Sequence, residues 1–161
     1  MESRHGPSPS GARPKPGQAS ASPARRVLLV DDQPFFLAMG QNIVRAGGYA
    51  VQTAASGAEA LELARTAPPD LILLDVEMPG MDGFQTLGRL KANPATAAIP
   101  VAMLTATLDP KLNQKAFQAG AEATILKSMS GARLLNMLQV VLTTARAAEP
   151  LAGPDRRMAI L

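Results

Sequence analysis

The sequence predicts an α/β fold, an open, doubly wound, five-stranded parallel sheet with helices on both faces. Two observations lead to this prediction. Five short apolar segments alternate with five segments of helical character, and repeated βα units require parallel strands joined by right-handed crossovers. Several apolar segments are also continuous rather than alternating with polar residues, as expected for strands that helices cover on both faces.

The first two βα units occupy residues 26–67. The run RVLLV at 26–30 is the first expected strand, and a helix is expected to begin at Pro34, because proline suits the first turn of a helix. Gly47-Gly48 is expected to end that helix. The run AVQTA at 50–54 is the second strand, and the helical segment GAEALELARTA comes after it.

The other three units have the same order. The third strand, DLILLD, is expected at 70–75 with its helix at 83–93; the fourth strand, IPVAMLTA, is expected at 99–106. The helix after it, at 109–120, has a proline in its first turn and a glycine at its end. The last unit combines the strand ATILK at 123–127 with a helix at 131–148.

Composition divides the 161 residues into one domain and two tails. Residues 1–25 are basic and rich in Pro, Ser and Gly, and are expected to be disordered because they bury too little apolar surface to offset the entropy of ordering. Residues 26–148 are the expected folded domain, and residues 149–161 form a short C-terminal tail. No second globular segment follows residue 148, so we expect a single-domain protein without a fused output domain.

Charge and composition exclude several classes of function. Residues 1–26 carry a net charge of +4 and residues 27–148 a net charge of −1. The basicity therefore belongs to the tail, and with tryptophan absent we expect no nucleic-acid binding. Cysteine is also absent, which excludes disulfides and fits a cytoplasmic location. No apolar run is long enough to span a membrane, so no membrane association is expected.

Polar side chains lie at the ends of four of the five expected strands. Asp31 and Asp32 come directly after the first strand, Asp75 ends the third, Thr105 lies at the end of the fourth, and Lys127 at the end of the fifth. The second strand offers nothing comparable and would lie at the edge of the sheet. Because functional groups of such sheets gather at the carboxyl ends of the strands, we expect these side chains to share one crevice.

This set of side chains suits phosphoryl chemistry. Three neighbouring carboxylates repel one another, and a divalent cation removes the repulsion. Oxygen ligands in small number suit Mg²⁺, which keeps water ligands and often accepts phosphate oxygens. An ammonium and a hydroxyl can hold a phosphoryl oxygen. The set therefore predicts an aspartate that attacks phosphorus while a metal ion and a lysine neutralise the charge.

The motifs resemble those of response-regulator receiver domains, the phosphoacceptor modules of two-component signalling, such as stand-alone chemotaxis regulators. The resemblance covers residues 26–146 and implies the flavodoxin-like (βα)5 receiver fold. The matching stretches are LLVDDQP with Asp31 and Asp32, LILLDVEMPGMDG with Asp75, VAMLTA with Thr105, and GAEATILKS with Lys127.

The resemblance also implies roles for individual residues. Asp75 would be phosphorylated, and Thr105 and Lys127 would contact the phosphoryl group. Mg²⁺ would be bound by Asp75, by the main-chain carbonyl of Glu77, and by the acids after the first strand, Asp32 directly and Asp31 as a helper. Glu77 should flank the phosphoryl group, and we hypothesise that it modulates the attack of water and hence the phosphoryl lifetime.

Two positions depart from the family pattern. Thr124 stands three residues before Lys127, where the family usually has an aromatic ring that moves inward on phosphorylation. Ser128 stands where the family usually has a proline after a cis bond. Because a cis bond before another residue costs about 2.5–4 kcal/mol, we expect a trans bond and a differently shaped loop. Phosphorylation is still expected, with an altered output mechanism.

Some residues have purely structural interpretations. Asp31 and Asp32 could be turn or capping residues, although the other motifs favour the metal site. Asp82 is expected to cap the helix at 83–93. His5, the single histidine, lies in the N-terminal tail and is not expected to be catalytic. Apolar residues expected to pack rather than to contact a cofactor include Phe35, Phe36 and Leu37.

The predicted function is a phosphoacceptor switch and not an enzyme. The chain has no phosphate-binding Gly-x-x-x-x-Gly-Lys loop, so a histidine kinase, a phosphotransfer protein or a small donor must supply the phosphoryl group. Output is expected through protein contacts of the last two helices and the fifth strand, where a homodimer could also form. The residues expected on that surface are Lys111, Lys115, Arg133, Leu134, Leu135 and Leu138, although several of them must belong to the core.

Two alternatives are weighed against this function. A degenerate receiver would act as a binding scaffold without phosphorylation, which the departures at Thr124 and Ser128 favour. A haloacid-dehalogenase-like phosphohydrolase also uses an Asp nucleophile, a Thr, a Lys and paired acids. That family needs its acidic pair late in the chain and a second Asp two residues after the nucleophile, whereas here the pair comes first and Glu77 holds the second position.

Overall fold

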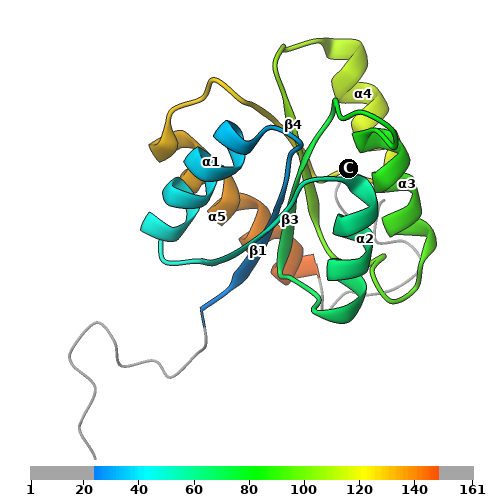
Figure 1. Cartoon of the computed structure of the whole chain (residues 1–161), viewed down its shortest axis with the longest axis horizontal. Coiled ribbons are helices and arrows are strands. Elements are labelled where there is room, and N and C mark those ends of the chain that lie inside the picture. The colour runs from blue at the N-terminus through cyan, green and yellow to red at the C-terminus, as the bar shows by residue number, and fades with distance from the viewer. Residues whose placement is uncertain (1–23, 149–161) are drawn as a thin grey trace, which may run out of the picture.

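The computed structural model describes residues 24–148, with side chains described to residue 145. The N-terminal tail predicted to be disordered and the predicted short C-terminal tail lie outside the described residues, apart from the two residues that precede the first strand. Five strands and five helices alternate along this part of the chain (Figure 1). The elements are β1 Arg26–Val30, α1 Pro34–Ala46, β2 Ala50–Ala54, α2 Gly57–Thr66, β3 Leu71–Asp75, α3 Gly83–Ala92, β4 Val101–Thr105, α4 Pro110–Ala119, β5 Ala123–Leu126 and α5 Gly131–Ala148.

The strands form one parallel sheet in the order β2-β1-β3-β4-β5. The predicted doubly wound fold is therefore confirmed, and β2 lies at an edge as expected. The predicted boundaries differ from the observed ones by a residue or two, since the strand expected at 99–106 spans Val101–Thr105. Among the described helices, none combines the length and apolarity needed to cross a membrane.

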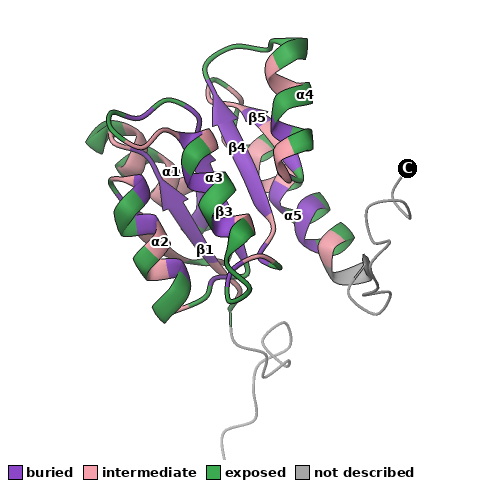
Figure 2. Cartoon of the chain, turned by 90° about the vertical axis from the view of Figure 1, so that its right-hand side faces the viewer, coloured by how far each residue is buried: buried purple, intermediate pink, exposed green. Residues whose placement is uncertain are grey.

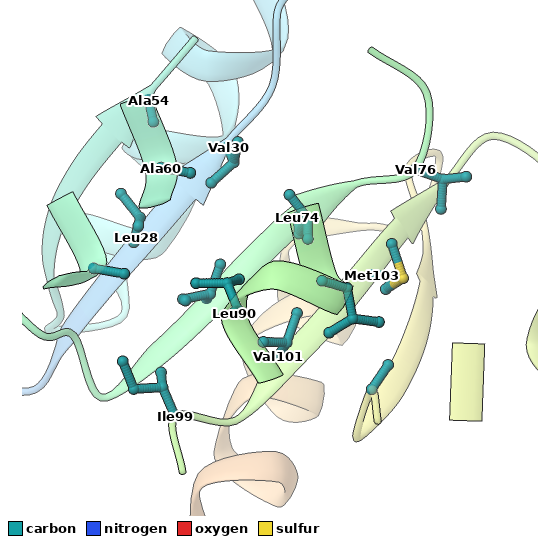
Figure 3. Packing of buried hydrophobic residues seen from close by; sticks show 14 of the residues in the cluster. Leu28, Val30, Ala54, Ala60, Leu74, Val76, Leu90, Ile99, Val101 and Met103 are labelled. Atoms are coloured by element: carbon teal, nitrogen blue, oxygen red, sulfur yellow. The ribbon is translucent and has the colours of Figure 1, made fainter. Parts of the chain in front are cut away.

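Helices cover both faces of the sheet. In Figure 1, α1 and α5 lie on one side of the strands and α2, α3 and α4 on the other. Alternate strand residues supply the two cores: Leu28 and Leu74 pack toward α2, α3 and α4 (Figure 3), whereas Leu29 and Leu73 pack toward α1 and α5. Burial on both faces explains the continuous apolar runs in the sequence.

The central strands are the most buried part of the molecule. Every residue of β3 and β4 is buried, and Figure 2 shows β4 in the buried colour beside partly exposed helices. Full burial of an aliphatic side chain stabilises the fold by about 1.5–3 kcal/mol. The strands that end in Asp75 and Thr105 are therefore rigidly held supports for those two side chains.

The loop after β3 is closed by the start of α3. Asp82 caps the helix by accepting a hydrogen bond from the backbone N–H of Gln85 at 2.8 Å, and the Gln85 side chain accepts from the Asp82 N–H at 3.0 Å. The predicted capping role of Asp82 is thus confirmed. Gly83 donates its N–H to the carbonyl of Val76 at 2.9 Å. A Cβ at Gly83 would overlap the carbonyl oxygen of Asp75, so only glycine allows this close approach.

Candidate functional site

The carboxyl ends of β1, β3, β4 and β5 lie side by side at one edge of the sheet, because these strands are neighbours in it. Asp31 comes directly after β1, Asp75 ends β3 and Thr105 ends β4, and all three are buried, with exposed fractions of 1%, 4% and 4%. Lys127 comes directly after β5. The structure therefore brings together the side chains that the sequence places at the strand ends.

Lys127 lies at the centre of this group. Its Nζ atom is 2.7 Å from Oδ2 of Asp31 and 3.3 Å from Oδ1 of Asp75. Its backbone N–H donates to the carbonyl of Thr105 at 2.7 Å, which extends the pairing between β4 and β5. The ammonium also lies 4.2 Å from the centre of the Phe36 ring. The lysine thus contacts both buried acids and one aromatic face.

The three acids form a cluster suited to a cation. Asp31, Asp32 and Asp75 each offer a carboxylate oxygen, and these oxygens lie within 4.8 Å of one another. Oδ1 of Asp31 accepts a hydrogen bond from the backbone N–H of Gln33 at 3.0 Å. Oδ2 is buried and, beyond its ion pair with Lys127, has no hydrogen-bond partner among the described residues. A hard cation suits this combination of carboxylate oxygens and an incompletely satisfied buried atom.

The charges of the site are mutually dependent. Burial, followed by the charge of Asp31, raises the pKa of Asp75 to about 6, although Lys127 acts in the opposite direction. Burial lowers the pKa of Lys127, but its bonds and charge interactions with Asp31 and Asp75 outweigh that effect and raise the pKa overall. The lysine is therefore a permanent cation at neutral pH, and the acids would gain from a further one.

A crevice of about 300 Å³ opens beside Asp75. At its wall, the Thr105 hydroxyl donates to the carbonyl of Thr107 at 3.0 Å and accepts from the Thr107 N–H at 3.3 Å. A phosphoryl group placed on Asp75 would compete for that hydroxyl. The residues that line the crevice are Gln33, Phe36, Asp75, Val76, Glu77, Thr105, Ala106, Lys127 and Ser128.

Glu77 contacts the site through its backbone. Its N–H donates to Oδ1 of Asp75 at 3.3 Å, and its exposed side chain borders the crevice. The position predicted to flank the phosphoryl group is thus open to solvent. Its expected contribution of a carbonyl ligand to Mg²⁺ stays a prediction.

The two departures from the family pattern have structural counterparts. Thr124 donates its hydroxyl to Oδ1 of Asn113 at 2.7 Å, which links β5 to α4 by a polar contact where the family usually has a ring. The described residues contain no cis peptide bond, so the bond between Lys127 and Ser128 is trans, as expected.

Phe36 is the site residue that the sequence analysis missed. The sequence predicts that it packs like its neighbours, yet its ring lies over the Lys127 ammonium. The prediction for Phe35 was wrong, because 70% of that residue is exposed, although its ring forms a T-shaped pair with the Phe36 ring, 5.8 Å away between centres. Adjacent helical residues point about 100° apart, so one of the two had to face away from the sheet.

Comparison with known proteins gives one consistent result. The family model for the response regulator receiver domain matches residues 27–139. The chain is 42% identical over 118 residues to a gliding motility regulatory protein of Myxococcus xanthus, an alignment that covers 73% of this chain and 15% of that protein. This chain therefore spans a small part of the length of that relative.

Two further matches extend over nearly the whole length of the matched protein. The polar-differentiation response regulator DivK of Brucella ovis is 32% identical over 121 residues, covering 75% of this chain and 98% of that protein. The crystal structure of the Vibrio cholerae chemotaxis protein CheY4 is 34% identical and superposes with a TM-score of 0.71 over 74% of this chain and 99% of that one.

Proposed function

The chain belongs to the response regulator receiver domain family, and from this premise we propose that it is a signalling switch that accepts a phosphoryl group on Asp75. One observation carries the proposal. The Asp75 carboxylate is buried at the end of β3, 3.3 Å from a lysine that also pairs with a second acid, beside a crevice large enough for a phosphoryl group.

The proposed reaction is a displacement at phosphorus. An oxygen of the ionised Asp75 carboxylate forms a bond to phosphorus, and the bond from phosphorus to the donor nitrogen or oxygen breaks. The electron pair of that bond leaves with the donor, and the product is an acyl phosphate. Lys127 offsets the negative charge that gathers on the phosphoryl oxygens. Thr105 can donate to one of them by exchanging its hydrogen bond to Thr107.

Asp31, Asp32 and Asp75 would hold Mg²⁺, with the carbonyl of Glu77 as a further ligand. When bound, the ion neutralises phosphoryl oxygens during transfer. The buried Oδ2 of Asp31 supports this assignment because, apart from its ion pair with Lys127, it has no partner among the described residues.

Receiver domains take their phosphoryl groups from histidine kinases or phosphotransfer proteins, and we assign the same class of donor to this chain. Signalling would proceed through protein contacts on α4, β5 and α5, with a homodimer as one form of output. Leu138 is one of the predicted residues that belong to the core and not to that surface, because it is fully buried. The single-domain organisation and the cytoplasmic location stay predictions.

The two competing functions differ in how well they fit this chain. Membership of the receiver family argues against the haloacid-dehalogenase-like hydrolase. The scaffold without phosphorylation remains the alternative, and the ion pairs of Lys127 argue against it, because a scaffold has no need of a buried, charged crevice.

The test is incubation with Mg²⁺ and acetyl phosphate, followed by intact-mass measurement, and in parallel with beryllium fluoride, followed by NMR. We expect a labile phosphoryl adduct and beryllium fluoride-dependent shifts around the crevice, both lost in Asp75→Ala. Wild-type protein that gives neither response supports the scaffold and overturns the proposal. An adduct that persists in Asp75→Ala would show that the acceptor is another residue.

A further inference from the structure

Phe36 lines two neighbouring cavities. One is the crevice beside Asp75, and the other is a cavity of about 200 Å³ between α1 and the start of α5. Lys127 lines both cavities, and the second is also lined by Asp31 and by apolar side chains that include Leu29, Ile43 and Leu134. The half-buried Phe36 ring therefore borders both, with one face toward the Lys127 ammonium, 4.2 Å from the ring centre.

Few contacts restrain the position of the Lys127 ammonium. The side chain is a flexible four-carbon stem ending in a point charge. The ammonium contacts two acids, at 2.7 Å for Asp31 and 3.3 Å for Asp75, and the Phe36 ring. The next residue, Ser128, lacks the ring with which a proline would stiffen the following loop. Of these three contacts, the aromatic face is the one that a divalent cation cannot take over.

The acids alone cannot hold the lysine throughout the proposed reaction. A cation held by Asp31, Asp32 and Asp75 would compete with Lys127 for the Asp31 and Asp75 carboxylates, and it would repel the ammonium. A cation over an aromatic face is attracted to the ring quadrupole, most strongly where water is partly excluded. Phe36 can therefore keep the ammonium at the crevice while its carboxylate partners are shared.

We propose that Phe36 is a positioning residue for phosphoryl transfer, which acts by holding the Lys127 ammonium against its ring face beside Asp75. The expected effect on phosphorylation rests on the proposed function, whereas the contact between the ammonium and the ring does not. It assigns to one of two adjacent phenylalanines a role that its neighbour Phe35 does not share.

The geometry is tested by NMR on the metal-free protein. The Lys127 ε-methylene is bonded to the Nζ atom that lies 4.2 Å from the ring centre, so the ring current should move its protons upfield of those of the other lysines. We expect Phe36→Leu to remove this displacement and Phe35→Leu to leave it intact. Phe36→Tyr should retain it, because the ring face is kept. Lys127 shifts that are the same in wild type and Phe36→Leu would overturn the inference, whatever the phosphorylation result.

The consequence is tested by the rate of phosphorylation with acetyl phosphate and Mg²⁺. We expect Phe36→Leu to slow the reaction about threefold to tenfold, with Phe36→Tyr and Phe35→Leu close to wild type. The effect of Phe36→Leu should vanish in a Lys127→Met background if the ring acts through the lysine. An undiminished effect there, or a Tyr variant as slow as the Leu variant, would contradict the inference. Failure of wild type to react would instead count against the proposed function.

Discussion

Two buried regions of this domain are built on opposite principles. The core between sheet and helices consists of aliphatic side chains such as Leu73 and Leu74, which are fully buried and need no partner. The crevice at the strand ends is almost as buried, yet it contains Asp31, Asp75 and a lysine. One strand, β3, contributes to both regions within five residues.

The difference separates stability from function. Burial of apolar side chains stabilises a fold, whereas a buried ion pair often stabilises no more than apolar side chains of the same size would. The crevice therefore costs stability that the core must offset, and its charges are explained by the chemistry proposed for them. Substitutions in the crevice should change phosphorylation and those in the core should change stability.

The largest effect is expected at the centre of the crevice. Lys127→Met removes the cation nearest to Asp75 and should slow phosphorylation by acetyl phosphate on the order of 100-fold, the scale of losing one preorganised charge-stabilising group. Time-resolved intact-mass measurement gives the rate. Lys115→Met, which removes an exposed lysine from the Phe84 ring on the other face, is the control and should react like wild type.

A substitution in the core should lower stability and leave phosphorylation intact. Leu74→Ala leaves a cavity beneath the strand that carries Asp75 and should lower the free energy of unfolding by about 3 kcal/mol. Urea unfolding measures this loss, and Leu108→Ala, at a position that is 68% exposed, should have little effect. The folded variant should still accept a phosphoryl group. Loss of phosphorylation in fully folded Leu74→Ala would contradict the claim that the core serves stability and the crevice serves phosphorylation.

The cost of the buried charge should be visible directly. Since the pKa of Asp75 is raised to about 6 from 3.8, the folded protein binds a proton more readily than the unfolded chain, and this group destabilises the fold as pH rises from about 4 to 6. Asp75→Asn removes the charge and should stabilise the metal-free protein at pH 7 by about 1–3 kcal/mol. Thermal unfolding should show that the stability difference between Asp75→Asn and wild type disappears at pH 4 and becomes smaller when Mg²⁺ is added. A stability difference between Asp75→Asn and wild type that grows as the pH falls would show that the pKa of Asp75 is lowered in the folded protein and not raised.

The smallest effect concerns the exposed edge of the crevice. If Glu77 influences the approach of water, Glu77→Ala should change the decay of the phosphorylated form about twofold to threefold, the scale of one exposed charge interaction. Loss of the phosphoryl mass over time measures the decay. Equal decay in both proteins would reject the hypothesis, and Glu62→Ala, an exposed acid on α2, is the matched control.

The order of the strands made much of the site predictable from sequence. Asp31, Asp75, Thr105 and Lys127 could be placed together because parallel strands end at one edge of the sheet. The same reasoning placed β2 at the sheet edge, and capping chemistry assigned Asp82.

Side-chain geometry could not be predicted in the same way. Phe35 and Phe36 are alike in sequence, and only the rotation of α1 against the sheet decides which ring meets Lys127. The closer approach of Lys127 to Asp31 than to Asp75 depends on the conformation of a flexible side chain, which the sequence does not specify. The bond from Thr124 to Asn113 depends on where α4 docks, which no local pattern specifies.

The most direct test of phosphorylation at Asp75 is to locate the phosphoryl group itself. Protein treated with acetyl phosphate and Mg²⁺ is reduced with borohydride, which converts an aspartyl phosphate to a stable alcohol, and its peptides are then analysed by mass spectrometry. We expect modification at residue 75 alone, dependent on Mg²⁺ and reduced in Lys127→Met. Modification at another acid, or none in folded wild-type protein, would contradict the assignment of Asp75 as the acceptor.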